Sequence, residues 1–176
     1  TFQTAQERSL IRVGFQIEKG ETSLTRTFPK KPFVPSDEQT RAARCEEILT
    51  IQAMGLKKRL AHTNARTAVV GISGGLDSTL ALLVTAKAFD MLGRDKKDIL
   101  AVTMPCFGTT DRTYQNACEM SKKVGATLIE VPIAEAVNIH FRDIGHDPDV
   151  HDVTYENSQA RERTEVLMNL ANQAGG

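Results

Sequence analysis

The chain has 176 residues, of which 40% are hydrophobic, 22 are basic and 22 are acidic. This length and composition suit one soluble domain with a sizeable core. Because the charges cancel, no broad positive field is available to hold a polyanion, so nucleic acid is a poor default partner.

Three cysteines, Cys45, Cys106 and Cys118, are an odd number without paired spacing, which favours reduced thiols in a cytoplasmic protein. No apolar run is long enough to span a bilayer, and the first residues lack a signal-peptide pattern, so we expect no membrane partner. The chain starts without Met and stops at Gly176, directly after an expected helix. We interpret it as a piece of a longer protein.

The first segment predicts a β-hairpin. Residues 10–28 alternate apolar and polar side chains around Lys19-Gly20-Glu21, with Val13 and Phe15 on one face. Residues 28–35 then hold three prolines, which indicates a stiff connector. We therefore predict a tail or linker over residues 1–35 and a domain over residues 36–176.

The domain is predicted to alternate strands and helices. A capping box at Ser36 and Gln39 opens the first helix. Strands are expected over residues 66–72, 99–104 and 127–131, and helices over residues 36–62, 79–92, 111–124, 133–141 and 155–174. This order favours an α/β fold with an open parallel sheet, right-handed crossovers and helices on both faces. Ligands then bind beyond the carboxyl ends of the strands, where Ser73, Met104 and Pro132 arrive.

The stretch Gly71-Ile72-Ser73-Gly74-Gly75-Leu76-Asp77-Ser78 joins the first strand to an apolar helix. Two adjacent glycines let successive backbone N–H groups converge on one point, and the helix N-terminus adds unpaired N–H groups. The two serines offer hydroxyls to phosphate oxygens, and Asp77 offers a carboxylate to a phosphate-bound Mg²⁺. The stretch predicts a nucleoside triphosphate site.

Two commoner phosphate loops are excluded. The P-loop needs a lysine, and none lies between Arg66 and Lys87, while the dinucleotide pattern Gly-x-Gly-x-x-Gly is absent here. The alternative is a plain turn in which Asp77 and Ser78 only cap the helix. Capping explains one such residue, but it does not explain two serines, two glycines and an aspartate within six positions.

Other polar residues have ordinary explanations. The loop from His146 to Asp152 invites a metal interpretation, but it lacks specific ligand spacing and is more typical of a solvated loop. Cys106 follows a strand as a nucleophile could, yet no nearby His would activate it, so packing is the favoured interpretation. His62 and His140 are near helix ends, where capping explains them.

One helix face carries a second unusual pair. Asn157 and Arg161 are four residues apart, so an amide and a guanidinium point the same way. On composition alone, an exposed helix with Arg161–Glu165 pairing is favoured.

Several motifs together resemble one family. They are the Gly-x-Ser-Gly-Gly-Leu-Asp-Ser loop, then Met104-Pro105 with Thr109, Thr110, Thr113 and Asn116, and then Glu156-Asn157-x-Gln159-Ala160-Arg161. The combination is similar to the synthetase domain of glutamine-dependent NAD⁺ synthetases over about residues 35–176. The loop alone marks only the larger group of pyrophosphatase-loop ATP-dependent ligases, which have an adenine nucleotide alpha hydrolase-like fold.

The resemblance implies an activity and a set of ligands. The family amidates deamido-NAD⁺ to NAD⁺ through an acyl-adenylate, using ATP and Mg²⁺, with ammonia from glutamine hydrolysed in a nitrilase-like domain. ATP contacts would fall on residues 71–78 and Met104, catalytic roles on Ser73, Asp77 and Ser78, and the metal on Asp77. Deamido-NAD⁺ would contact Asn157 and Arg161 at a homodimer interface or in a larger homo-oligomer. This implication now outweighs the plain-helix interpretation.

The sequence also departs from the family. A Gly-Thr-x-x-x-x-x-Glu stretch and a lysine segment, which supply further ATP and Mg²⁺ contacts, are not among the 176 residues, so we expect this chain alone to be inactive. Two alternatives stay open. One is another ligase with this loop, such as a GMP synthetase or a tRNA thiolase, and the other is a nucleotide-binding module without turnover.

Overall fold

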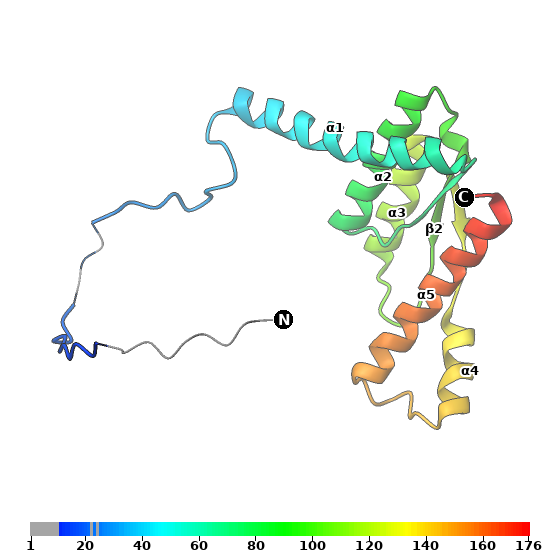
Figure 1. Ribbon diagram of the computed structural model, residues 1–176. Coiled ribbons are helices and arrows are strands. Elements are labelled where there is room, and N and C mark those ends of the chain that lie inside the picture. Colours follow the sequence, from blue (N-terminus) through cyan, green and yellow to red (C-terminus); the bar gives the residue numbers. More distant parts are fainter. Residues whose placement is uncertain (1–10, 22, 24) are drawn as a thin grey trace. The chain divides into compact units, whose positions relative to one another are not determined.

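The computed structural model describes residues 11–21, 23 and 25–176, and the chain divides after Ser36 into two compact units. All helices and strands of the described residues lie in the second unit, Asp37–Gly176 (Figure 1). In chain order they are α1 (Glu38–Thr63), β1 (Ala68–Gly71), α2 (Leu76–Leu92), the short 3-10 helix η1 (Lys96–Asp98), β2 (Ile99–Thr103), α3 (Asp111–Val124), β3 (Thr127–Glu130), α4 (Ala134–Ile144) and α5 (Val153–Ala174). The predicted alternation of strand and helix is confirmed.

The three strands form a parallel sheet in the order β1-β2-β3. Val70 of β1 lies opposite Ala101 of β2, and Val102 of β2 lies opposite Ile129 of β3. Because the strands run in the same direction, their carboxyl ends meet at one edge of the sheet, where parallel sheets bind their ligands.

Helices cover both faces of this sheet, as predicted. On one face, Ala101 packs in a cluster with Phe89 of α2. On the other face, Val102 packs with Phe141 of α4 and Tyr155 of α5. Figure 1 shows α2 and α3 on one side of β2 and α5 on the other. Although α2 is apolar, no helix among the described residues has both the length and the apolar character needed to cross a membrane.

The first helix starts one residue later than the capping box suggested. Asp37, rather than Ser36, is the N-cap, and its side chain accepts a hydrogen bond from the backbone N–H of Thr40 at 2.7 Å. This bond also lowers the pKa of Asp37. Aspartate and serine cap helices about equally well, so the sequence pattern did not distinguish these neighbours. Further along, Ala53 packs on α2.

The predicted hairpin is wrong for the part of the segment that the structure describes. None of residues 11–21, 23 and 25–28 lies in a strand, and residues 10, 22 and 24 are outside the described residues. Val13 and Phe15 are 78% and 79% exposed. A two-stranded hairpin without an apolar surface to pack on is marginal in water, which explains the difference. The role of residues 1–35 as a tail after a glutaminase domain stays a prediction.

Candidate functional site

A cavity of about 770 Å³ opens at the carboxyl edge of the sheet. Its walls come from the turn after β1, the end of β2 with the loop that follows, the first turn of α3, and the start of α5. Elements that are more than 80 residues apart in the sequence therefore share one cavity. The cavity lies beyond the carboxyl ends of the strands, where the sequence predicts a ligand.

The glycine turn forms one wall of the cavity. Ile72 continues β1, and its N–H donates to Val102 O at 2.8 Å. Gly74 then adopts φ +79°, and a β-carbon there would collide with the backbone of Thr113 in α3. Only glycine fits both the dihedral angle and the space. The turn is thus held against α3, which fixes where its backbone N–H groups point.

The two serines of the turn bond to each other and to its backbone. Their hydroxyl oxygens are 3.2 Å apart, Gly75 N donates to Ser73 Oγ at 3.3 Å, and Ser78 Oγ donates to Gly75 O at 3.1 Å. Gly75 is the N-cap of α2, without a side-chain cap. Helix capping by Asp77 or Ser78 therefore does not account for this stretch. The hydroxyls are clustered where α2 presents its unpaired N–H groups.

Only some residues of the predicted loop line the cavity. Ser73 and Gly75 line it together with Gly71, whereas Gly74, Leu76, Asp77 and Ser78 are outside its lining. Leu76 is 89% exposed at the first turn of α2. Asp77 is exposed, and its carboxylate makes no hydrogen bond or ion pair with any described residue. The carboxylate of Asp77 is thus exposed to solvent without a partner among the described residues.

The end of β2 forms the floor of the cavity. Met104 is 8% exposed and contacts the space beside Gly71, so it lines the cavity from within the core. A turn follows, in which Cys106 N donates to Thr109 Oγ1 at 3.0 Å. Burial raises the pKa of the Cys106 thiol. A raised pKa opposes nucleophilic reactivity and agrees with the packing interpretation of this residue.

Tyr114 of α3 lines the same cavity and ties this helix to the sheet. Its hydroxyl donates to Glu130 Oε2 of β3 at 2.6 Å. That bond is the main reason why the pKa of Tyr114 is raised to about 12. At neutral pH the phenol therefore stays protonated, and it keeps α3, with Thr113 beside Gly74, in place.

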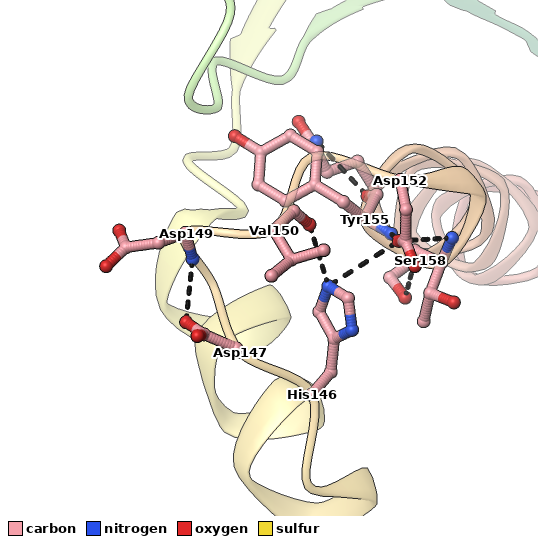
Figure 2. A network of polar contacts seen from close by, with 9 residues as sticks. His146, Asp147, Asp149, Val150, Asp152, Tyr155 and Ser158 are labelled. Atoms are coloured by element: carbon pink, nitrogen blue, oxygen red, sulfur yellow. Dashed lines mark hydrogen bonds and ion pairs between the residues drawn. The ribbon is translucent and has the colours of Figure 1, made fainter.

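The loop before α5 sets the start of that helix (Figure 2). Asp152 is the N-cap and accepts from the N–H groups of Thr154 at 2.8 Å and Tyr155 at 3.0 Å. These bonds, the one from Tyr155 first, hold the pKa of Asp152 below its usual range. His146 Nε2 lies 3.1 Å from Val150 O and 3.7 Å from Asp152 Oδ1.

Asp147, earlier in the same loop, binds the backbone. Asp147 Oδ1 accepts from Asp149 N at 3.0 Å, which closes a local turn. Within residues 11–21, 23 and 25–176, no group of three or more His, Cys, Asp and Glu side chains is placed to hold a metal ion. Figure 2 shows the side chains of His146, Asp147 and Asp152 in contacts that shape this loop and the start of α5.

Aromatic rings line the cavity next to α5. Tyr155 is 8% exposed and stacks on His151, with 4.2 Å between ring centroids. The ring centroid of Phe107, from the loop after β2, lies 5.8 Å from that of Tyr155 and 6.5 Å from that of Phe141. Burial raises the pKa of Tyr155. These rings give this side of the cavity an aromatic surface on which a planar ring could stack.

The start of α5 contributes to the cavity, but through other residues than the two that the motif singled out. Asn157 and Arg161 are exposed and do not line the cavity. The residues of α5 that do line it are Tyr155, Glu156, Gln159, Arg163 and Leu167. The spacing of four between Tyr155, Gln159, Arg163 and Leu167 could have revealed this face, because residues four apart lie on one side of a helix.

The chain is similar to proteins named NAD synthetases. The family model described as NAD synthase matches residues 48–176. The glutamine-dependent NAD(+) synthetase of Mycobacterium leprae is 43% identical over 171 residues, or 94% of this chain and 25% of that protein. Its namesake from Mycobacterium tuberculosis (strain ATCC 25618 / H37Rv) is 40% identical over 96% of this chain and 26% of that protein. The chain spans about a quarter of the length of these relatives.

Solved structures agree with the fold. A glutamine-dependent NAD⁺ synthetase from Acinetobacter baumannii, in complex with ADP, has a TM-score of 0.67 and 28% identity, covering 74% of this chain and 24% of that one. An NMN synthetase from Francisella tularensis has a TM-score of 0.63 and 22% identity, covering 74% and 51% of the two chains. At the latter identity only the fold is shared. The predicted adenine nucleotide alpha hydrolase-like fold is confirmed.

Proposed function

The chain belongs to the NAD synthase family, and we propose that it provides the nucleotide-binding part of an enzyme that amidates deamido-NAD⁺ to NAD⁺ at the expense of ATP. One observation carries the proposal: the glycine turn, the end of β2 and the start of α5 converge on a single cavity. Such a cavity at the carboxyl edge of a parallel sheet is where this fold class holds its ligands. We place the reaction in the cytoplasm.

The proposed chemistry explains the missing lysine. A carboxylate does not accept ammonia at neutral pH until its oxygen becomes a good leaving group. The nicotinate carboxylate attacks the α-phosphate of ATP, pyrophosphate leaves, and ammonia then attacks the acyl-adenylate to give the amide and AMP. The N–H of Gly74, the unpaired N–H groups in the first turn of α2 and the Ser73 hydroxyl would hold the departing pyrophosphate. A γ-phosphoryl transfer, for which the P-loop lysine serves, does not occur.

Mg²⁺ fits this chain through a single protein ligand. Asp77 offers an exposed carboxylate with no partner among the described residues. Magnesium sites commonly use one or two carboxylates and take their remaining ligands from phosphate oxygens and water. When bound, the ion would neutralise charge on the pyrophosphate. Ser78, bonded to the turn, would keep this part of α2 aligned with the phosphates.

The second substrate and the partners are also part of the proposal. Asn157 and Arg161 are exposed on α5, outside the cavity of their own chain, which suits a substrate held between two copies of the protein. We propose that deamido-NAD⁺ bridges from the cavity to this face in a homodimer or a larger homo-oligomer. Ammonia would come from glutamine through a nitrilase-like domain.

The test separates this function from the other ligases and from a passive module. Pyrophosphate release by the full-length enzyme is measured with ATP and Mg²⁺, adding either deamido-NAD⁺, xanthosine monophosphate or tRNA. Of the three additions, we expect only deamido-NAD⁺, with ammonia present, to cause pyrophosphate release. Release with xanthosine monophosphate or tRNA would favour the other ligases, and ATP binding without release under any condition would favour the module.

A further inference from the structure

Arg163 stands out among the residues that line the cavity. Of the described residues in that lining, it is the one with a permanent positive charge, and it is only partly exposed. Its guanidinium makes no hydrogen bond or ion pair with any described residue. Partial burial of an unpaired charge is unfavourable, so such a group is normally balanced by a counter-charge. The cavity gives this charge access to a ligand.

Two contacts fix where α5 lies along β1. At its C-terminal end, Gly175 O accepts from Arg66 N at 2.8 Å, just before the strand begins. Near the other end of the strand, the Leu167 side chain lies 3.0 Å from the point where a β-carbon on Gly71 would be. Moving from Gly175 to Leu167 along α5 thus means moving from the amino end to the carboxyl end of β1.

The position of Arg163 follows from this direction of α5. It precedes Leu167 by four residues, so it lies on the same face of the helix and about 6 Å further along the axis. That step carries it past the carboxyl end of β1, to the level of the turn that begins at Ser73. Arg163 and the turn, which are far apart in the sequence, then line the same cavity.

We propose that Arg163 binds a phosphate oxygen of the nucleotide held at the glycine turn, an inference that rests on the proposed function. The turn supplies backbone N–H groups and hydroxyls, but residues 67–86 contain no lysine or arginine. A guanidinium donates two parallel hydrogen bonds to a phosphate and keeps its charge at every physiological pH. Arg163 therefore supplies the cationic contact that the loop lacks.

Calorimetric titration of the 176-residue chain with Mg-ATP and with pyrophosphate tests the assignment. We expect Arg163→Gln to weaken both ligands about tenfold, the range for losing a charged hydrogen bond. Arg163→Lys should bind both ligands more tightly than Arg163→Gln, because it keeps the charge. It should bind them less tightly than the unaltered chain, because lysine cannot donate two parallel hydrogen bonds. Arg142→Gln, which removes an exposed arginine on α4 outside the cavity, is the matched control and should bind like the unaltered chain.

Each outcome is decisive. Equal affinities for Arg163→Gln and the unaltered chain would overturn the role of Arg163 and leave the proposed function standing. A similar loss in Arg142→Gln would also overturn it, because the effect would then come from net charge. Failure of the unaltered chain to bind either ligand would overturn both the assignment and the proposed nucleotide site. If Arg163→Gln does not fold, as judged by circular dichroism, the comparison of Arg163→Lys with the control decides.

Discussion

The carbonyl carbon of Thr113 lies 2.8 Å from the point that a β-carbon on Gly74 would occupy. Gly74 also has φ +79°, so alanine meets a clash and a strained backbone together. We predict that Gly74→Ala lowers the free energy of unfolding by about 1–3 kcal/mol, the usual cost of such strain, and abolishes measurable ATP binding. Denaturant unfolding and calorimetry measure the two effects.

Gly55→Ala is the matched control for this change. Gly55 lies inside α1, and a β-carbon added to it would meet no atom within 4 Å. Alanine is the better helix former, so the control should stabilise the protein by about 0.5–1 kcal/mol. If Gly74→Ala were as harmless as Gly55→Ala, the turn would not depend on its contact with α3.

Asp77→Asn tests the metal assignment. The change keeps the shape of the side chain but removes its charge. The Asp77 carboxylate makes no hydrogen bond or ion pair with a described residue, so the fold should be unaffected. At limiting Mg²⁺ we expect the affinity of this variant for ATP to be about tenfold lower than that of the unaltered chain. Turnover of the full-length enzyme should be mostly lost. Asp143→Asn, on the exposed side of α4, is the control. An unchanged dependence on Mg²⁺ would contradict the role of Asp77.

Much of the fold could be predicted because its signals are local. Continuous apolar runs gave the three strands, and Gly93 and Gly125 gave the ends of α2 and α3, both with positive φ as expected for C-caps. The hairpin prediction failed because alternation alone does not provide a surface to pack on. Whether Val13 and Phe15 find such a surface is a tertiary question that periodicity does not address.

The candidate site was predicted only in part. The glycine turn is a local pattern, so its position could be found from the sequence. The face of α5 that lines the cavity depends on the packing of Leu167 beside Gly71, which joins residues 96 positions apart. Counting back four residues from the apolar Leu167 would have reached Arg163 on the same face of the helix. The motif instead drew attention to Asn157 and Arg161, which are exposed.

Arg161→Gln and Arg163→Gln should affect different ligands. Arg161 is exposed outside the cavity and is assigned to deamido-NAD⁺, while Arg163 lines the cavity and is assigned to the nucleotide phosphates. In the full-length enzyme we expect Arg161→Gln to raise the KM for deamido-NAD⁺ about tenfold with little change for ATP. Equal losses for both substrates, or no loss, would return this part of α5 to an ordinary solvated helix face.

The pH dependence of stability should reveal the cap of α5. The pKa of Asp152 is lowered in the folded protein, mainly by the hydrogen bond from Tyr155 N, so the ionised cap contributes stability above the pKa of an unfolded aspartate, near 4. This contribution is lost as the pH falls from there through the lower folded pKa. Thermal melts between pH 2 and 6 measure it.

Two substitutions separate the charge from the cap. Asparagine caps helices as well as aspartate does but does not titrate, so Asp152→Asn should stay capped and lose this part of the acid dependence. Asp152→Ala should melt at a lower temperature than the unaltered chain above about pH 4, and the difference should shrink as the pH falls. Among the described ion pairs, the one that involves Asp152 joins its Oδ1 to His146 Nε2, 3.7 Å away. A melting profile of Asp152→Asn that matches the unaltered chain at low pH would contradict the assignment.

The last prediction concerns the 176-residue chain alone. The glycine turn, the Ser73 hydroxyl and Arg163 all lie around its cavity, so the groups that we propose to hold phosphates are present. The glutamate and lysine that the family resemblance assigns to the rest of the ATP and Mg²⁺ site are not among its residues. Binding groups without the full set of charges stabilise the ground state but not the transition state. We therefore expect Mg-ATP, AMP and pyrophosphate to bind weakly, and no NAD⁺ to form from ATP, Mg²⁺, ammonia and deamido-NAD⁺. Chromatographic detection of NAD⁺ after prolonged incubation is the measurement, with the full-length enzyme as positive control. Sustained synthesis by the purified chain would mean that residues 1–176 already contain every group that the reaction needs.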